Sequence, residues 1–157
     1  MFKRIIGQDT RDASLGNQDW LNVDALAQVE VTSEDPAHPI ESGLLPGSDA
    51  GWRAAQPGPQ IVRLVFNQPQ KIRRMYVVFH EHELERTQQF VLRWSSDGGQ
   101  SYREIVRQQY NFSPPATTSE REDYSVNLDG VTALELNIVP DISGGSARAS
   151  LAQLRLA

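Results

Sequence analysis

A chain of 157 residues is long enough for one domain with its own hydrophobic core. Hydrophobic residues make up 39% and charged residues 22%, a composition typical of a folded globular protein and not of a disordered chain or a coiled coil. The net charge of −5 opposes attraction to nucleic acid phosphates and to anionic membranes, so neither is expected as a partner. The absence of cysteine excludes disulfides, thiolate metal sites and cysteine nucleophiles.

The N-terminal segment, residues 1–27, shows no regular apolar period. Its run Ile5-Ile6 is too short for a signal-peptide core or a membrane span, which favours a cytoplasmic protein. Its apolar residues Trp20, Leu21, Val23 and Leu26 predict that the segment packs along the remainder of the chain without forming a second domain. No internal repeat is present, and we therefore expect a single domain over residues 1–157.

From residue 28 onward the apolar residues recur with a period of two, which indicates β-strands. A short helix is predicted over residues 39–45, and turn residues such as those at 67–69 and 129–130 separate the strands. Eight strands bounded in this way predict an all-β, two-sheet jelly-roll sandwich. They are expected at residues 28–33, 61–66, 72–79, 89–96, 103–106, 124–128, 133–139 and 150–156.

The alternation within these strands also assigns residues to the core. Leu134, Leu136 and Ile138 share one face of their strand and are expected to be buried. Trp94 alternates with Phe90 in the same way, which predicts that both aromatic rings anchor the interior of the sandwich.

No known catalytic motif is present: the sequence lacks GxSxG, GxxxxGK[ST], GxGxxG and HExxH. The nearest approach to a metal or catalytic cluster is His80-Glu81-His82-Glu83, because two histidines two residues apart share a face of an extended strand. No histidine follows His82, however, and we interpret the cluster as an acidic loop after a strand. The protein is therefore not expected to be an enzyme, and no metal site is predicted.

The order of several segments resembles the galactose-binding-like, or discoidin, jelly-roll family. This family includes the type C domains of coagulation factors and the family 32 carbohydrate-binding modules. The resemblance covers residues 29–157, and its most specific element is the strand, Asp-Gly turn and aromatic of SSDGGQSYREI. The other segments are, in order, VTSE, GWRA, QKIRRMYVVF and ASLAQLRLA.

The resemblance also raises the question of a metal ion. In many sugar-binding members a calcium ion is held by an Asp-Gly-Asn turn ahead of the tryptophan and by a glutamate in the last strand. Here the turn reads LPGSD ahead of Trp52, and Gln153 stands where the glutamate is expected. Because calcium prefers several anionic oxygens, no cofactor is predicted, and a weak calcium site around Asp49 is the alternative.

The resemblance further implies that a ligand binds to the loops at one end of the sandwich, here near residues 49–53, 80–86, 110–118 and 141–148. We expect aromatic, imidazole, amide and guanidinium groups in these loops to contact it. The strongest local signal is Tyr110-Asn111-Phe112 ahead of a diproline, on a long loop predicted over residues 107–123; internal packing of this loop is the alternative. The candidate ligand-binding residues are Trp52, Arg53, His80, His82, Arg86, Tyr110, Asn111, Phe112 and Arg148.

Together these observations predict a non-catalytic binding module, with carbohydrate as the ligand class that the resemblance implies. The alternative is a protein-interaction module that uses a sheet face or a strand edge in place of the loops.

Overall fold

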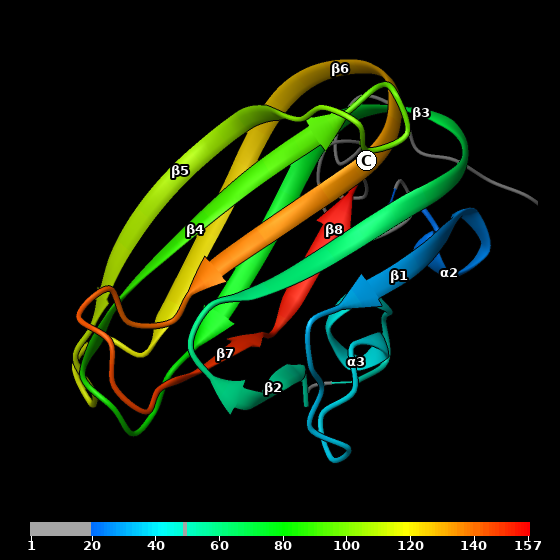
Figure 1. The fold of residues 1–157 in the computed structure, drawn as a ribbon. Helices are drawn as coiled ribbons and strands as arrows, with labels where there is room; N and C mark the ends of the chain where they lie inside the picture. The colour runs from blue at the N-terminus through cyan, green and yellow to red at the C-terminus, as the bar shows by residue number, and fades with distance from the viewer. Residues whose placement is uncertain (1–19, 49) are drawn as a thin grey trace, which may run out of the picture.

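The computed structural model describes residues 20–48 and 50–157, and the chain folds into an antiparallel β-sandwich (Figure 1). The prediction that residues 1–27 pack along the sandwich therefore falls largely outside the described residues. The elements, in chain order, are α2 (Val23–Leu26), β1 (Ala27–Val31), α3 (Glu41–Leu44), β2 (Trp52–Pro57), β3 (Gln60–His80), β4 (Arg86–Ser95), β5 (Arg103–Phe112), β6 (Ser119–Val139), β7 (Arg148–Leu151) and β8 (Gln153–Leu156). Neither described helix is long and apolar enough to cross a membrane.

Two long, bent strands connect the layers of the sandwich. The first part of β3 pairs with β1 and with the last part of β6, whereas the second part of β3 pairs with β8 and with the first part of β6. Strands β4 and β5 extend the first layer in the order β1-β3-β6-β4-β5, and β2 and β7 form a separate two-stranded ribbon. All of these pairings are antiparallel, so the predicted all-β jelly-roll class is confirmed.

The predicted strand boundaries differ from the observed ones where a turn signal lies inside a strand. The strands expected at 61–66 and 72–79 are one strand, β3, and those expected at 124–128 and 133–139 are one strand, β6. The bends are absorbed by shifts of the β3–β6 register between Val65 and Arg74, and Gly130 adopts a φ of +67° at the bend of β6. Strand β2 was not predicted, and the last predicted strand divides into β7 and β8 at Ala152.

The core lies between the two layers and contains most of the residues expected there. Leu134, Leu136 and Ile138 are buried as predicted, and Phe90 packs against Phe79 with ring centroids 5.1 Å apart. Trp94 packs against the core but stays half-buried, because the β4–β5 register shifts just before it. The short helix α3 lies within the predicted range of 39–45.

One carboxylate is buried on the opposite side of β6 from these leucines. Glu135 is only 2% exposed, and it accepts hydrogen bonds from Arg63 on β3 and from Arg93 on β4. Burial alone raises the pKa of this carboxyl, but hydrogen bonds from Asn137, Arg93 and Arg63 outweigh it, so the pKa is lowered. The two arginines therefore allow a charge to lie within the sheet.

Candidate functional site

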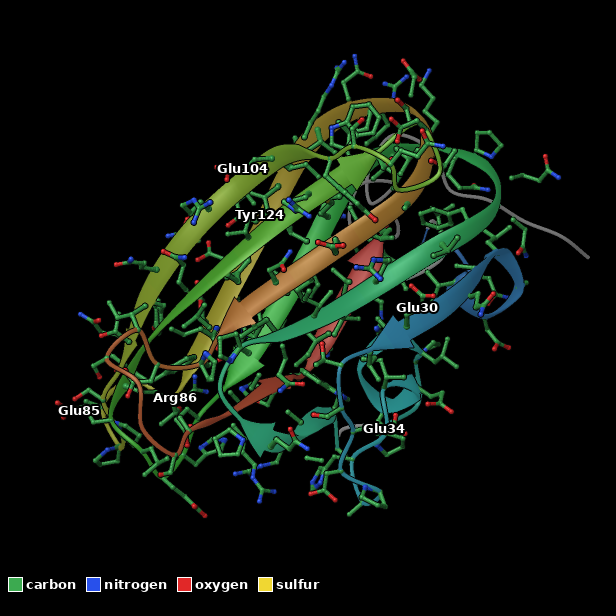
Figure 2. The ribbon with its side chains drawn as sticks, viewed as in Figure 1. Glu30, Glu34, Glu85, Arg86, Glu104 and Tyr124 are labelled. Atoms are coloured by element: carbon green, nitrogen blue, oxygen red, sulfur yellow. The ribbon has the colours of Figure 1, made fainter. Side chains whose placement is uncertain are left out.

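The connections at one end of the sandwich form the candidate site, at the bottom of Figure 1. This end contains the loop between β3 and β4, the loop between β6 and β7, and the β2–β7 ribbon. Arg86 and Glu85 mark the same end in Figure 2. Because loops at the end of a sandwich vary without disturbing the core, they are a common place for ligand binding.

A shallow cleft lies beside the β2–β7 ribbon and consists of two adjoining hollows of about 180 and 140 Å³. Both hollows are lined by Arg53, His80, His82 and Ser150. We call this feature the loop-end cleft. Its other lining residues are His38, Ala50, Trp52, Leu151 and Ala152 in the larger hollow and Glu81, Glu83 and Arg148 in the smaller one.

The ribbon places three polar side chains on one face. Arg53 on β2 lies opposite Ser150 on β7, and Arg148 lies two residues before Ser150, which puts it on the same side of the strand. The backbone of Arg53 is held on both sides: its N–H donates to His38 O (3.1 Å), and its carbonyl accepts the N–H of Asp35 (2.8 Å). The exposed Arg53 side chain thus projects from a fixed backbone.

Two histidines form the opposite wall. His80 ends β3 and His82 follows it, and their rings stack with centroids 5.8 Å apart. His80 is half-buried, and burial, followed by the neighbouring His82 and Arg121, lowers its pKa from 6.5. The imidazole of His80 is therefore held in its neutral form at neutral pH.

The loop after His80 is fixed by an ion pair. Glu81 accepts a hydrogen bond from Arg86 Nε at 2.6 Å, and its second oxygen accepts the backbone N–H groups of Glu83 and Leu84. Arg86 Nη1 in turn donates to Pro140 O at 2.6 Å, in the β6–β7 loop. The two loops on this side of the cleft are thereby joined through one guanidinium.

The charges of the cleft are unevenly balanced. Among the described residues, the guanidiniums of Arg53 and Arg148 have neither an ion pair nor a hydrogen bond. The carboxylate of Asp35 lies 3.6 Å from His38, and its pKa is lowered chiefly by the Ala37 N–H and further by His38 and Arg148. The cleft therefore presents exposed cations together with hydrogen-bonding imidazoles.

Trp52, Arg53, His80, His82 and Arg148 are the predicted site residues that line this cleft. Trp52 contributes only to its floor, because its side chain is buried and its Nε1 donates to Ser33 O. The Trp52 ring, a candidate contact in the sequence analysis, is therefore not exposed for stacking against a ligand.

The remaining predicted site residues lie elsewhere. Tyr110, Asn111 and Phe112 belong to β5 and not to a long loop, so the loop predicted over residues 107–123 is wrong; only residues 113–118 connect β5 to β6. Phe112 and Arg86 are buried, and the Tyr110 hydroxyl donates to Ser119 O. Asn111 is exposed but faces Thr87 of β4 in the ladder.

His38 and Ser150 are among the cleft residues that the candidate list from the sequence did not contain. His38 lies in a turn between two prolines, Pro36 and Pro39, where no strand pattern assigns it a direction. Ser150 alternates with Arg148 along β7, and this period of two was the available signal for placing both on one face.

The residues around the alternative calcium site can be described only in part, because Asp49 lies outside the described residues. Two carbonyls just ahead of it, that of Gly43 in the last turn of α3 and that of Leu45 at the C-cap of this helix, accept hydrogen bonds from the guanidinium of Arg155 at 3.0 and 3.2 Å. Among the described residues, no group of three His, Asp or Glu side chains is arranged to hold a metal ion. A side-chain cation thus binds the carbonyls at the C-terminal end of α3.

A larger hollow of about 700 Å³ lies between Trp20, Tyr76 and the turn at residues 44–48. Trp20 and Ser48, which line it, are each next to residues outside the described ranges, so its full lining is not defined by the described residues.

No protein-family model matches the chain, and no curated protein sequence matches it either. The solved structures that resemble it include the family 32 carbohydrate-binding module of C. perfringens NanJ in complex with galactose, with a TM-score of 0.65 and 11% identity over 87% of this chain and 96% of that chain. The module CpGH89CBM32-5 from Clostridium perfringens, in complex with GalNAc-β-1,3-galactose, has a TM-score of 0.61 and 16% identity over 87% and 98% of the two chains.

A third similar structure is the family 32 module of AlyQ in complex with 4,5-unsaturated mannuronic acid, with a TM-score of 0.62 and 14% identity over 84% of this chain and 95% of that chain. At these identities the likeness concerns the fold. The jelly-roll fold of these modules, which the sequence resemblance implied, is thereby confirmed.

Proposed function

We propose that this galactose-binding-like sandwich is a non-catalytic module that binds carbohydrate in the loop-end cleft. The observation that carries the proposal is the convergence of Arg53, Arg148 and the His80–His82 pair, from three separate parts of the chain, on one open cleft. Guanidinium and imidazole groups are planar donors whose geometry suits pairs of sugar hydroxyls. The similar solved modules carry galactose, a GalNAc-galactose disaccharide or a mannuronic acid derivative, which supports the same ligand class here.

The cleft is small, which suggests that it binds only a small part of a glycan. Its hollows of about 180 and 140 Å³ are smaller than the roughly 300 to 1,000 Å³ of pockets that enclose a drug-sized molecule. A surface site of this size suits one or two sugar rings at the end of a longer chain.

The carboxylates of the cleft support a role in binding and not in hydrolysis. Glycosidases generally use two carboxyl groups that flank the scissile bond. Of the two carboxylates that line the cleft, Glu81 is held by Arg86 and by the backbone of its own loop, which leaves Glu83 without a second carboxylate opposite it.

A glycan array followed by calorimetry with the best ligand tests this proposal. Arg53→Gln and His82→Gln are expected to weaken binding at least tenfold while the melting temperature changes little, because both side chains are exposed. Arg73→Gln is the matched control: Arg73 is also exposed and lies seven residues before His80 in β3, about 23 Å along the strand. Equal losses in Arg53→Gln and Arg73→Gln would place the site elsewhere.

The second candidate function, protein binding, is favoured by a strand edge. Within the described part of the chain β5 pairs only with β4, so its other edge is available to a strand of a partner. Exposed large hydrophobic side chains are limited, among the described residues, to Leu84 and Ile142, which gives little support to an apolar sheet face.

The two functions are distinguished by competition. A protein captured through β5 should be released by Gln109→Lys, because an exposed lysine on an edge strand opposes strand addition, and it should be unaffected by excess sugar. A ligand of the loop-end cleft should instead be displaced by excess sugar and should bind the Gln109→Lys variant as well as the wild type.

A further inference from the structure

We infer that the loop-end cleft selects saccharides that carry a carboxylate, such as uronic or sialic acids, over neutral sugars of the same shape. The inference rests on the proposed carbohydrate function and adds charge selectivity to it. It is drawn from the arginines on the β2–β7 ribbon.

The first observation is that these arginines are not neutralised within the described residues. The chain has a net charge of −5, and arginines on the sheet, such as Arg63 and Arg93, are paired with the buried Glu135. Arg53 and Arg148 are exposed, line the cleft and have no carboxylate partner in the described part of the chain. Positive charge is thus left at this concave surface of an acidic protein.

The second observation is that Arg53 and Arg148 are both neighbours of Ser150 on one face of the ribbon. Arg53 lies directly across the ribbon from Ser150, so their Cβ atoms are about 5 Å apart. Arg148 is two residues from Ser150 on the same face, about 7 Å along the strand. A carboxylate seated over Ser150 therefore lies within reach of both guanidiniums, each of which can form two parallel hydrogen bonds to it.

The third observation concerns the acidic groups that would oppose such a ligand. Asp35 lines neither hollow; it accepts the N–H of Ala37 and interacts with the charge of Arg148, while Glu81 is paired with Arg86. Glu83 is exposed and has no ion pair among the described residues. Among the residues that line the cleft, the two guanidiniums without an ion pair outnumber the one carboxylate without an ion pair, and this balance favours an anion.

Calorimetry with matched pairs of sugars tests this inference. The probes are oligosaccharides ending in galacturonic, mannuronic or sialic acid, each beside its carboxyl-reduced, neutral counterpart, at 50 and 300 mM NaCl. We expect at least one acidic probe to bind tenfold or more tightly than its neutral counterpart, with the preference reduced at the higher salt concentration.

Substitutions of the arginines test whether the preference for acidic sugars arises in the cleft. Arg53→Gln combined with Arg148→Gln should abolish the preference, Arg53→Lys combined with Arg148→Lys should retain part of it, and Arg73→Gln should leave it intact. Equal or tighter binding of the neutral counterparts would overturn charge selectivity and leave the proposed function standing. Failure of every acidic and neutral sugar to bind would overturn the proposed function itself.

Discussion

Arg86 lies over the ring of Phe112, with its guanidinium carbon 4.7 Å from the ring centroid. The two residues are register partners at the start of β4 and the end of β5, and both are buried. Arg86 also donates a hydrogen bond to Glu81 in the loop beside the cleft. The Phe112 ring thus supports the candidate site from below, through a cation–π contact.

Replacing Phe112 with alanine is therefore expected to damage the fold. Phe112→Ala should lower the free energy of unfolding by about 3 to 5 kcal/mol, because it removes a fully buried aromatic ring. The neighbouring exposed residue supplies the control, and Asn111→Ala should cost less than about 1 kcal/mol. Urea denaturation of both variants measures the difference. A stable Phe112→Ala protein would show that the ring is not part of the core.

The contribution of Glu120 to the stability of the protein is expected to fall as the pH rises from about 4.5 to 8. Glu120 is 1% exposed, and burial, followed by the neighbouring Glu122, raises its pKa from 4.5 to about 8. Between these values the unfolded chain releases a proton that the folded protein retains, so deprotonation favours unfolding, by at most about 1.4 kcal/mol for each pH unit. Above pH 8 this contribution becomes constant.

Glu120→Gln should remove that dependence and raise the melting temperature at pH 8. Glu104→Gln, at an exposed carboxyl on β5, is the control and should leave the pH profile unchanged. Thermal melts from pH 4.5 to 8.5 check the expectation. Parallel profiles for the wild type and Glu120→Gln would contradict a buried, protonated carboxyl.

Arg155 is expected to stabilise the C-terminal end of α3. Its guanidinium donates to the carbonyls of Gly43 and Leu45, and hydrogen bonds from a charged donor contribute about 1.5 to 3 kcal/mol. Arg155→Gln should therefore lower the melting temperature, whereas Arg73→Gln, the same change at an exposed position, should not. Similar melting temperatures for both variants would mean that the two carbonyls do not depend on Arg155.

Removal of metal ions is expected to leave stability unchanged. The carbonyls at the C-terminal end of α3 already bind a guanidinium, and no described cluster of His, Asp or Glu is arranged for a metal ion. The melting temperature should be the same, within error, in 5 mM EDTA and in 5 mM CaCl₂. A rise of several degrees with calcium would reveal a site that involves Asp49.

The sequence pattern predicted the fold class well, because alternation reports directly which face of a strand is buried. It predicted Leu134, Leu136 and Ile138 correctly for this reason. It failed at residues 67–69 and 129–130, where turn-forming residues bend a continuous strand, since local preference does not reveal whether the chain continues in the same ladder.

The candidate site was predictable in part. The charged residues of the cleft were found because the resemblance indicated which loops gather at one end of the sandwich. Phe112 was misplaced because the diproline after it was interpreted as part of a long loop that holds the aromatic residues exposed. Yet Tyr110 and Phe112 alternate with exposed Gln109 and Asn111, a period of two that indicates a strand. His38 could not be placed, since its position depends on a pairing with Arg53 that is set by the fold.

The contacts of the chain's described ends determine how the cleft is oriented when the protein is attached to a sensor chip. Leu21 N–H donates to Leu156 O, and the carbonyl of Ala157 accepts the N–H groups of Arg73 and Arg74. Both described ends of the chain therefore lie far along β3 from His80, and Figure 1 marks the C-terminus at the end of the sandwich away from β2 and β7. A protein immobilised on a sensor chip through Ala157 would present the loop-end cleft to the flowing solution.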